Sequence, residues 1–72
     1  RSHIVLPGLV DGHMHTTSSI LRGVAQDVGN WMMHGTAPFL VNATRQTRAA
    51  GGRLGIAEAI LNGTTTIGDE GM

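Results

Sequence analysis

The sequence has no cysteine and almost no aromatic residues, and both absences narrow what the chain can do. Without cysteine it can form neither a disulfide nor a thiolate metal site. One tryptophan, one phenylalanine and no tyrosine leave few rings on which nucleic-acid bases could stack. Five basic residues balance five acidic ones, so no basic surface for nucleic acid is expected.

Long apolar runs are also missing. No stretch approaches the roughly 18 consecutive apolar residues that suggest a membrane span, and the run at residues 4–6 is too short for the core of a signal peptide. We therefore expect no contact with a membrane and, by default, a cytoplasmic location. A length of 72 residues corresponds to one small domain or to part of a larger one.

The order of local patterns is strand, helical region, strand. Residues 4–6 are a short apolar run that Pro7-Gly8 ends, and residues 9–15 read as a second extended run. Residues 64–68 are rich in β-branched side chains and predict a strand. Two strands joined through a helix form a βαβ unit, in which the strands are parallel.

The clearest helix lies just before the second strand. Its apolar stripe at helical spacing comprises Ala50, Leu54, Ala57 and Leu61, widened by Ile56 and Ile60. Asn42 or Thr44 can cap its start, and Asn62-Gly63 favours its end. Gly51-Gly52 lies inside, and each glycine costs about 1 kcal/mol relative to alanine. We expect either a kink at this pair or packing that compensates for it.

The segment between the first strand and this helix gives weaker signals. Residues 16–19 suit a loop, and residues 20–28 carry apolar side chains at helical spacing that Gly23 breaks. Residues 31–33 begin a further apolar patch, which Pro38 is expected to interrupt.

His13 and His15 carry the strongest chemical signal. On a strand, residues i and i+2 project to the same side with Cβ atoms about 6.6 Å apart, at roughly 3.3 Å per residue. Two such imidazoles can bind one metal ion at about 2.0–2.1 Å. The alternative is a chance His-x-His with two solvated rings. Two histidines also do not complete a catalytic zinc site, which needs about three protein ligands and a water.

Two aspartates lie where they can assist. Asp11 shares the face of the histidines and can orient an imidazole by accepting its N–H, or it has a purely structural role. Asp69 ends the second strand, the position that faces the active crevice in parallel α/β folds, and it is a candidate for contact with metal, water or substrate. Capping of the following turn is the favoured interpretation for Asp69.

The remaining polar and sulfur-containing residues have ordinary interpretations. His3 is expected to be solvated, and His34 to be a surface or partly buried structural residue. Met32 and Met33 are expected to fill the core. Glu58 is expected on the solvated face of the helix, or as a partner of Arg53 or Asn62.

Two ordered signatures resemble the amidohydrolase superfamily. Residues 5–15, Val-Leu-Pro-Gly-Leu-Val-Asp-Gly-His-Met-His, are similar to the start of its barrel, Pro-Gly-x-(Val/Ile)-(Asp/Asn)-x-His-x-His. Residues 20–23, Ile-Leu-Arg-Gly, resemble the Leu-Arg-Gly of its cytosine/guanine-deaminase and triazine-chlorohydrolase branch, and Trp31 and Pro38 keep that branch's spacing. Residues 55–69 resemble its second signature, a helix followed by Gly-Thr-Thr-Thr and strand two.

The resemblance implies an α/β fold, the (β/α)₈ TIM barrel, of which residues 1–72 would supply only the first βαβ portion. Residues 4–6 would be the last strand of a preceding β-sandwich. His13 and His15 would be ligands of one divalent metal ion, Zn or Fe, and Trp31 would contact substrate. The remaining ligands and the catalytic carboxylate of the family lie beyond strand two, so we expect this chain alone to be inactive.

The implied activity is that of a metal-dependent hydrolase, in which metal-activated water cleaves a C–N or C–Cl bond of a small heterocyclic substrate. Hydantoinase-like and dihydroorotase-like enzymes, which hydrolyse cyclic amides, also begin with His-x-His and are an alternative. A second alternative is a small non-catalytic module in which two copies share one metal through His13 and His15. Open strand edges predict a homo-oligomer or other association.

Overall fold

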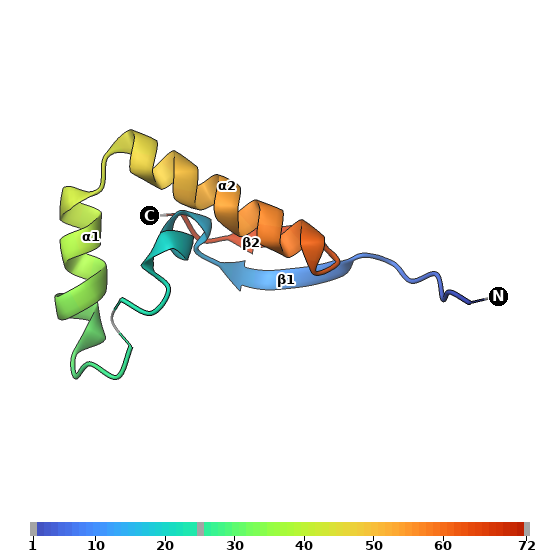
Figure 1. The fold of residues 1–72 in the computed structure, drawn as a ribbon, viewed down its shortest axis with the longest axis horizontal. Coiled ribbons are helices and arrows are strands. Elements are labelled where there is room, and N and C mark those ends of the chain that lie inside the picture. Colours follow the sequence, from blue (N-terminus) through green and yellow to red (C-terminus); the bar gives the residue numbers. More distant parts are fainter. Residues whose placement is uncertain (1, 25, 72) are drawn as a thin grey trace.

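The computed structural model describes residues 2–24 and 26–71, and it places a long helix beside a parallel pair of strands (Figure 1). In chain order the elements are β1 (Leu9–Met14), the 3₁₀ helix η1 (Thr16–Leu21), the π-helical turn η2 (Met32–Thr36), α1 (Ala37–Asn42), α2 (Arg45–Leu61) and β2 (Thr64–Asp69). The predicted order of strand, helical region and strand is confirmed.

The two strands pair in parallel, with Leu9 opposite Thr64 and Met14 opposite Asp69. The register shifts twice along the pair, so the ladder is irregular near the end of β1. β1 ends one residue earlier than predicted, at Met14, and β2 ends one residue later, at Asp69. His15 therefore lies just beyond the strand, at the carboxyl edge of the pair.

Residues 4–6 do not form the strand that was expected of them. Their side chains are strongly exposed, and within the described part of the chain no strand pairs with them. In Figure 1 this segment extends away from the strand pair. An isolated strand has no partner for its backbone groups, which explains why the run stays irregular.

Helix α2 has the predicted bounds and a well-defined cap at each end. Thr44 is the N-cap, and its Oγ1 accepts a hydrogen bond from the Thr47 N–H at 3.1 Å. Asn42 instead ends α1, where its side-chain amide donates to the Pro38 carbonyl at 2.7 Å. Gly63 follows the helix with a φ of +90°, a conformation that favours glycine. Among residues 2–24 and 26–71, no helix combines the length and apolar character needed to cross a lipid bilayer.

The segment between β1 and α2 differs from its prediction. The expected loop at residues 16–19 is the start of η1, which ends at Leu21, two residues before the break expected at Gly23. Gly23 has a φ of +80°, which a right-handed helix cannot contain. Pro38 does not interrupt the apolar patch, because it lies in the first turn of α1, where its missing N–H is tolerated.

Glycine, rather than the expected apolar stripe, forms the buried face of α2. Gly51, Gly55 and Ala59 are buried, whereas Leu54 is 40% exposed and Leu61 is 84% exposed. A Cβ atom at position 51 would overlap the Thr17 carbonyl oxygen of η1. Packing therefore compensates for the glycine pair: η1 approaches α2 so closely that side chains do not fit between them.

This close approach predicts that alanine substitutions at two neighbouring glycines change the stability in opposite directions. Gly51→Ala should lower the free energy of unfolding by on the order of 1–3 kcal/mol, because the new methyl group overlaps backbone. Gly52→Ala is the matched control. Its Cβ would lie 3.9 Å from the nearest atom, so the alanine should raise stability by up to about 1 kcal/mol through helix propensity. Urea unfolding of the natural gene product measures both, and equal effects at the two positions would contradict the packing.

Candidate active site

The two histidines of the His-x-His sequence lie together at the carboxyl end of β1. Their ring centroids are 4.9 Å apart, and the rings are nearly perpendicular, at 88°. His13 belongs to β1, and His15 is the N-cap residue of η1 with a φ of −123°. Both side chains are exposed. The irregular end of the strand thus brings the two imidazoles side by side.

The pair fits two positions of a metal site. Imidazole nitrogen is a preferred ligand of zinc and also suits iron, and the adjacent rings can converge on one ion. Among the residues that the structure describes, no group of three or more His, Cys, Asp or Glu side chains is placed to hold a metal. His13 and His15 therefore match part of a ligand set that needs about three protein groups.

Asp69 is hydrogen-bonded to the residue that follows His15. Its Oδ2 accepts from the Thr16 hydroxyl at 2.6 Å, and its Oδ1 accepts from the Thr16 N–H at 3.4 Å. Oδ1 also accepts from the Gly71 N–H at 3.4 Å, in agreement with the favoured capping role. Thr16 is only 4% exposed. Asp69 thus links the end of β2 to the start of η1.

The carboxylate beside the His13 ring belongs to Glu70, which sequence reasoning did not single out. Its Oε1 lies 3.6 Å from His13 Nδ1. For Asp11 the sequence left open an imidazole-orienting role and a structural one, and its carboxylate accepts a hydrogen bond from the backbone N–H of His13 at 3.1 Å, which fits the structural role. The available signal for Glu70 was its position directly after the second strand, at the edge where the carboxyl ends of parallel strands meet.

A cavity of about 700 Å³ opens beside the histidines. His15 and Trp31 both line it, so a predicted metal ligand and the predicted substrate-contacting residue share one space. The rest of its wall comes from residues 18–40, and includes Leu21, Met32 and Leu40. Asp69 and His13 are not among the lining residues. The cavity volume falls within the range of about 300–1,000 Å³ that is usual for small-molecule sites.

The ordinary interpretations of the other residues hold only in part. His3 is exposed beside Ser2, and His34 is exposed, as expected. Met32 and Met33 were expected to fill a core, but they are 50% and 61% exposed, and Met32 lines the cavity. The prediction failed because the segment that carries them packs against little of the described chain.

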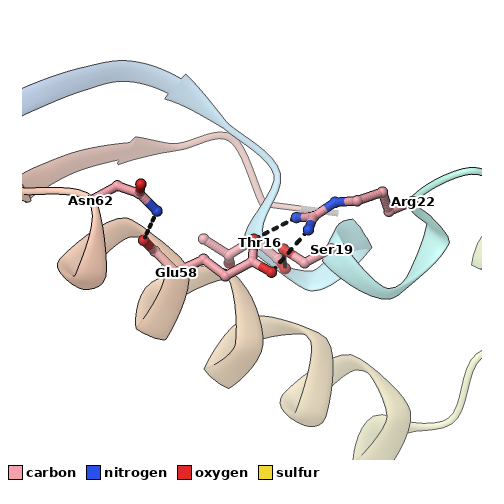
Figure 2. A network of polar contacts seen from close by, with 5 residues as sticks. All are labelled: Thr16, Ser19, Arg22, Glu58 and Asn62. Carbon is pink, nitrogen blue, oxygen red and sulfur yellow. Dashed lines mark hydrogen bonds and ion pairs between the residues drawn. The ribbon is translucent and has the colours of Figure 1, made fainter.

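An ion pair fastens the cavity wall to α2. Arg22, which lines the cavity, donates from Nη1 to Glu58 Oε1 at 2.9 Å and from Nη2 to Oε2 (Figure 2). The hydrogen bond to Arg22, with a smaller contribution from the Arg22 charge, lowers the pKa of Glu58. The hydrogen bond to Glu58, followed by the Glu58 charge, raises the pKa of Arg22. Of the partners expected for Glu58, Asn62 donates to its backbone carbonyl, whereas the carboxylate binds Arg22, which was not expected.

Comparison with known proteins places this site in a family. The model of the amidohydrolase family matches residues 4–71. The chain belongs to the amidohydrolase family. The superfamily resemblance and the parallel strand pair are both confirmed, whereas a complete amidohydrolase barrel stays a prediction for the protein that carries this chain.

Several relatives of this amidohydrolase chain are named as deaminases. A 5-methylthioadenosine/S-adenosylhomocysteine deaminase of Natronomonas pharaonis is 38% identical over 68 residues, which is 92% of this chain and 16% of that protein. One from Acetivibrio thermocellus is 38% identical over 71 residues. A 5'-deoxyadenosine deaminase of Methanobrevibacter smithii is 35% identical over 71 residues, or 96% of this chain and 16% of the relative. The chain thus spans 16% of the length of these relatives, and no solved structure matches it.

The Arg22–Glu58 pair predicts a pH-dependent stability. Because the pKa of Glu58 is lowered in the folded state, the pair stabilises fully above the ordinary glutamate pKa of about 4.3, and this is lost as pH falls through the lowered pKa. Glu58→Gln should therefore unfold more readily than the parent near neutral pH, and the difference should shrink and vanish in acid. Unfolding curves of the natural gene product from pH 7 to acid test this.

Arg53→Gln is the matched control for this experiment, because Arg53 was one of the two partners that the sequence offered for Glu58. It should leave the pH profile of the parent unchanged, and added salt should reduce the effect of Glu58→Gln. A pH-independent difference between the parent and Glu58→Gln would contradict the pairing.

Proposed function

We propose that the protein carrying this chain is a metal-dependent deaminase, with His13 and His15 as two ligands of one divalent ion, Zn or Fe. Its substrate would be a small heterocycle that bears an exocyclic amine, such as an adenine nucleoside. In the reaction, water supplies the oxygen of the product, the C–N bond to the amine breaks, and ammonia leaves.

The observation that carries this proposal is that His15 belongs to the histidine pair and also lines the cavity. A metal ligand and a substrate-sized space are thereby contiguous. When bound there, a divalent ion would lower the pKa of a water far below that of bulk water, towards about 7. The chain's own contribution is to hold the two imidazoles at the cavity edge and to form part of the cavity wall.

The cavity wall is suited to a flat, partly apolar ligand. Trp31 offers a large ring surface on which a heterocycle can stack, while Leu21, Met32 and Leu40 provide apolar surface. Ser18 and Gln26 supply hydroxyl and amide groups for hydrogen bonds. The relatives' names point to adenine nucleosides, and the wall described here has the chemistry to receive one.

The choice of reaction follows from the relatives. Within the branch that the sequence resembles, their names support removal of an amine. They give no support to hydrolysis of a C–Cl bond, which we therefore do not retain. Hydrolysis of a cyclic amide is the alternative that substrate assays would separate from deamination, because only deamination releases ammonia from an exocyclic amine.

Removal of either histidine tests the metal site directly. We expect the natural gene product, stripped of metal and then titrated with zinc by calorimetry, to bind through the pair. His13→Ala and His15→Ala should each weaken binding by more than the about 10–100-fold that accompanies loss of an outer partner. Ammonia release from 5'-deoxyadenosine should fall to the level of metal-free protein.

His34→Ala is the control, because His34 is exposed and does not line the cavity. Zinc binding that survives in both His13→Ala and His15→Ala would refute the ligand assignment. One metal per two chains would favour the shared site between copies over a deaminase centre.

Trp31 is expected to act on substrate binding rather than on the metal. Stacking of a base on an aromatic side chain contributes about 1–3 kcal/mol, so Trp31→Ala should raise KM by about 5- to 150-fold. The zinc affinity of Trp31→Ala should equal that of the parent. Trp31→Phe should have a KM between those of the parent and Trp31→Ala. Steady-state kinetics with 5'-deoxyadenosine measure KM, and zinc titration measures the metal affinity separately. A Trp31→Ala variant with unchanged KM would show that the ring does not contact substrate.

A further inference from the structure

We propose that Asp69 is a positioning residue for His15, and that it acts through the backbone and hydroxyl of Thr16. The proposal rests on the proposed function, in which His15 is a metal ligand. It gives Asp69 a role other than the direct contact with metal, water or substrate that its place in the sequence suggested.

The hydrogen bonds around His15 carry the argument. The peptide group before His15 is held because the Met14 carbonyl accepts from the Glu70 N–H at 2.8 Å. The peptide group after it is held because the Thr16 N–H donates to Asp69 Oδ1 at 3.4 Å. When both flanking peptide planes are fixed, φ and ψ of His15 are fixed, and with them the direction of its Cα–Cβ bond.

The hydrogen bond of the Thr16 hydroxyl is the shortest contact in this arrangement. It donates to Asp69 Oδ2 at 2.6 Å, within the short range of O–H···O⁻ bonds, and Thr16 is 4% exposed. Asp69 itself is exposed, but the Thr16 hydroxyl is buried, so loss of the bond leaves a buried hydroxyl without its acceptor. Thr16 also begins η1, whose N-cap residue His15 makes no capping bond with its own side chain. Asp69 supplies the missing acceptor from another element.

The hydrogen-bond partners of the Asp69 carboxylate favour a positioning role over a catalytic one. Oδ2 is bonded to the Thr16 hydroxyl, and Oδ1 is shared between the N–H groups of Thr16 and Gly71. Asp69 is not among the residues that line the cavity. Its oxygens are therefore directed at the chain itself, at the residue next to the ligand.

The test measures zinc affinity in the natural gene product, by competition with a chelating dye after metal removal. Asp69→Ala and Thr16→Val should each weaken zinc binding by about 10–100-fold, the range found when outer partners of metal ligands are lost. Thr16→Ser keeps the hydroxyl and should bind as the parent does. The double variant Asp69→Ala/Thr16→Val should bind zinc no more weakly than Asp69→Ala alone, because loss of the carboxylate already removes the bond to the Thr16 hydroxyl.

Two controls separate positioning from general loss of structure. Asp27→Asn removes a carboxylate from a left-handed residue that asparagine tolerates, and it should leave zinc affinity unchanged. Thermal unfolding of each metal-free variant confirms that it is folded at the titration temperature. The visible spectrum of the cobalt-loaded protein should change in Thr16→Val and return in Thr16→Ser, since it reports ligand geometry.

The outcomes are distinct for the two proposals. Parent-like zinc affinity in a folded Thr16→Val variant would overturn the positioning role alone. Zinc binding by the parent that is insensitive to His15→Ala would overturn the metal-site assignment and the positioning role with it. If Asp69→Ala does not fold, the comparison of Thr16→Val with Thr16→Ser decides by itself.

Discussion

The hydrogen bond between the Asp69 carboxylate and the Thr16 hydroxyl is the contact on which the rest of this structure depends. It joins residues 53 positions apart, and it lies where the carboxyl ends of both strands meet the first turn of η1. The Thr16 hydroxyl is buried and the Asp69 carboxylate is exposed, so the bond lies at the boundary between the packed chain and solvent. The end of β1, the direction of His15 and the start of the cavity wall are all set from this point.

A second constraint is steric and comes from the packing of α2 against η1. Gly51 and Gly55 let α2 approach η1 closely, so η1 is held between the helix and the strand ends. These contacts leave little freedom near the histidines, whereas the wall further along is fastened at exposed sites such as Arg22 with Glu58 (Figure 2). Exposed charge pairs are screened by solvent and salt. Packing is therefore close at η1, next to the proposed metal ligands, and the contacts that hold the cavity wall are more exposed.

Sequence reasoning found the parts of this arrangement that short-range patterns encode. The bounds of α2, its Thr44 cap, the two parallel strands and the shared side of His13 and His15 all follow from local residue types. It did not find the bond of Asp69 to Thr16 or the pair of Arg22 with Glu58, which join residues 53 and 36 positions apart. It also assigned the buried face of α2 to its apolar stripe. Periodicity marks which residues share a face, and close contact with η1 selected the glycine face.

The proposed metal ligands and most of the cavity wall lie on different segments of the chain, which bears on how such a protein can diversify. The proposed metal ligands and the residues bonded to their backbone lie on β1, at the start of η1 and at the end of β2, while the cavity wall apart from His15 comes from residues 18–40 of one connecting segment. That segment is tied to α2 through a few side chains, including Arg48, which donates to the Leu40 carbonyl at 2.7 Å. Substitutions within that segment can reshape the cavity while the proposed metal ligands stay in place. The proposed ligands and most of the cavity wall thus lie on adjoining stretches of sequence that meet at His15, so change in one need not alter the other.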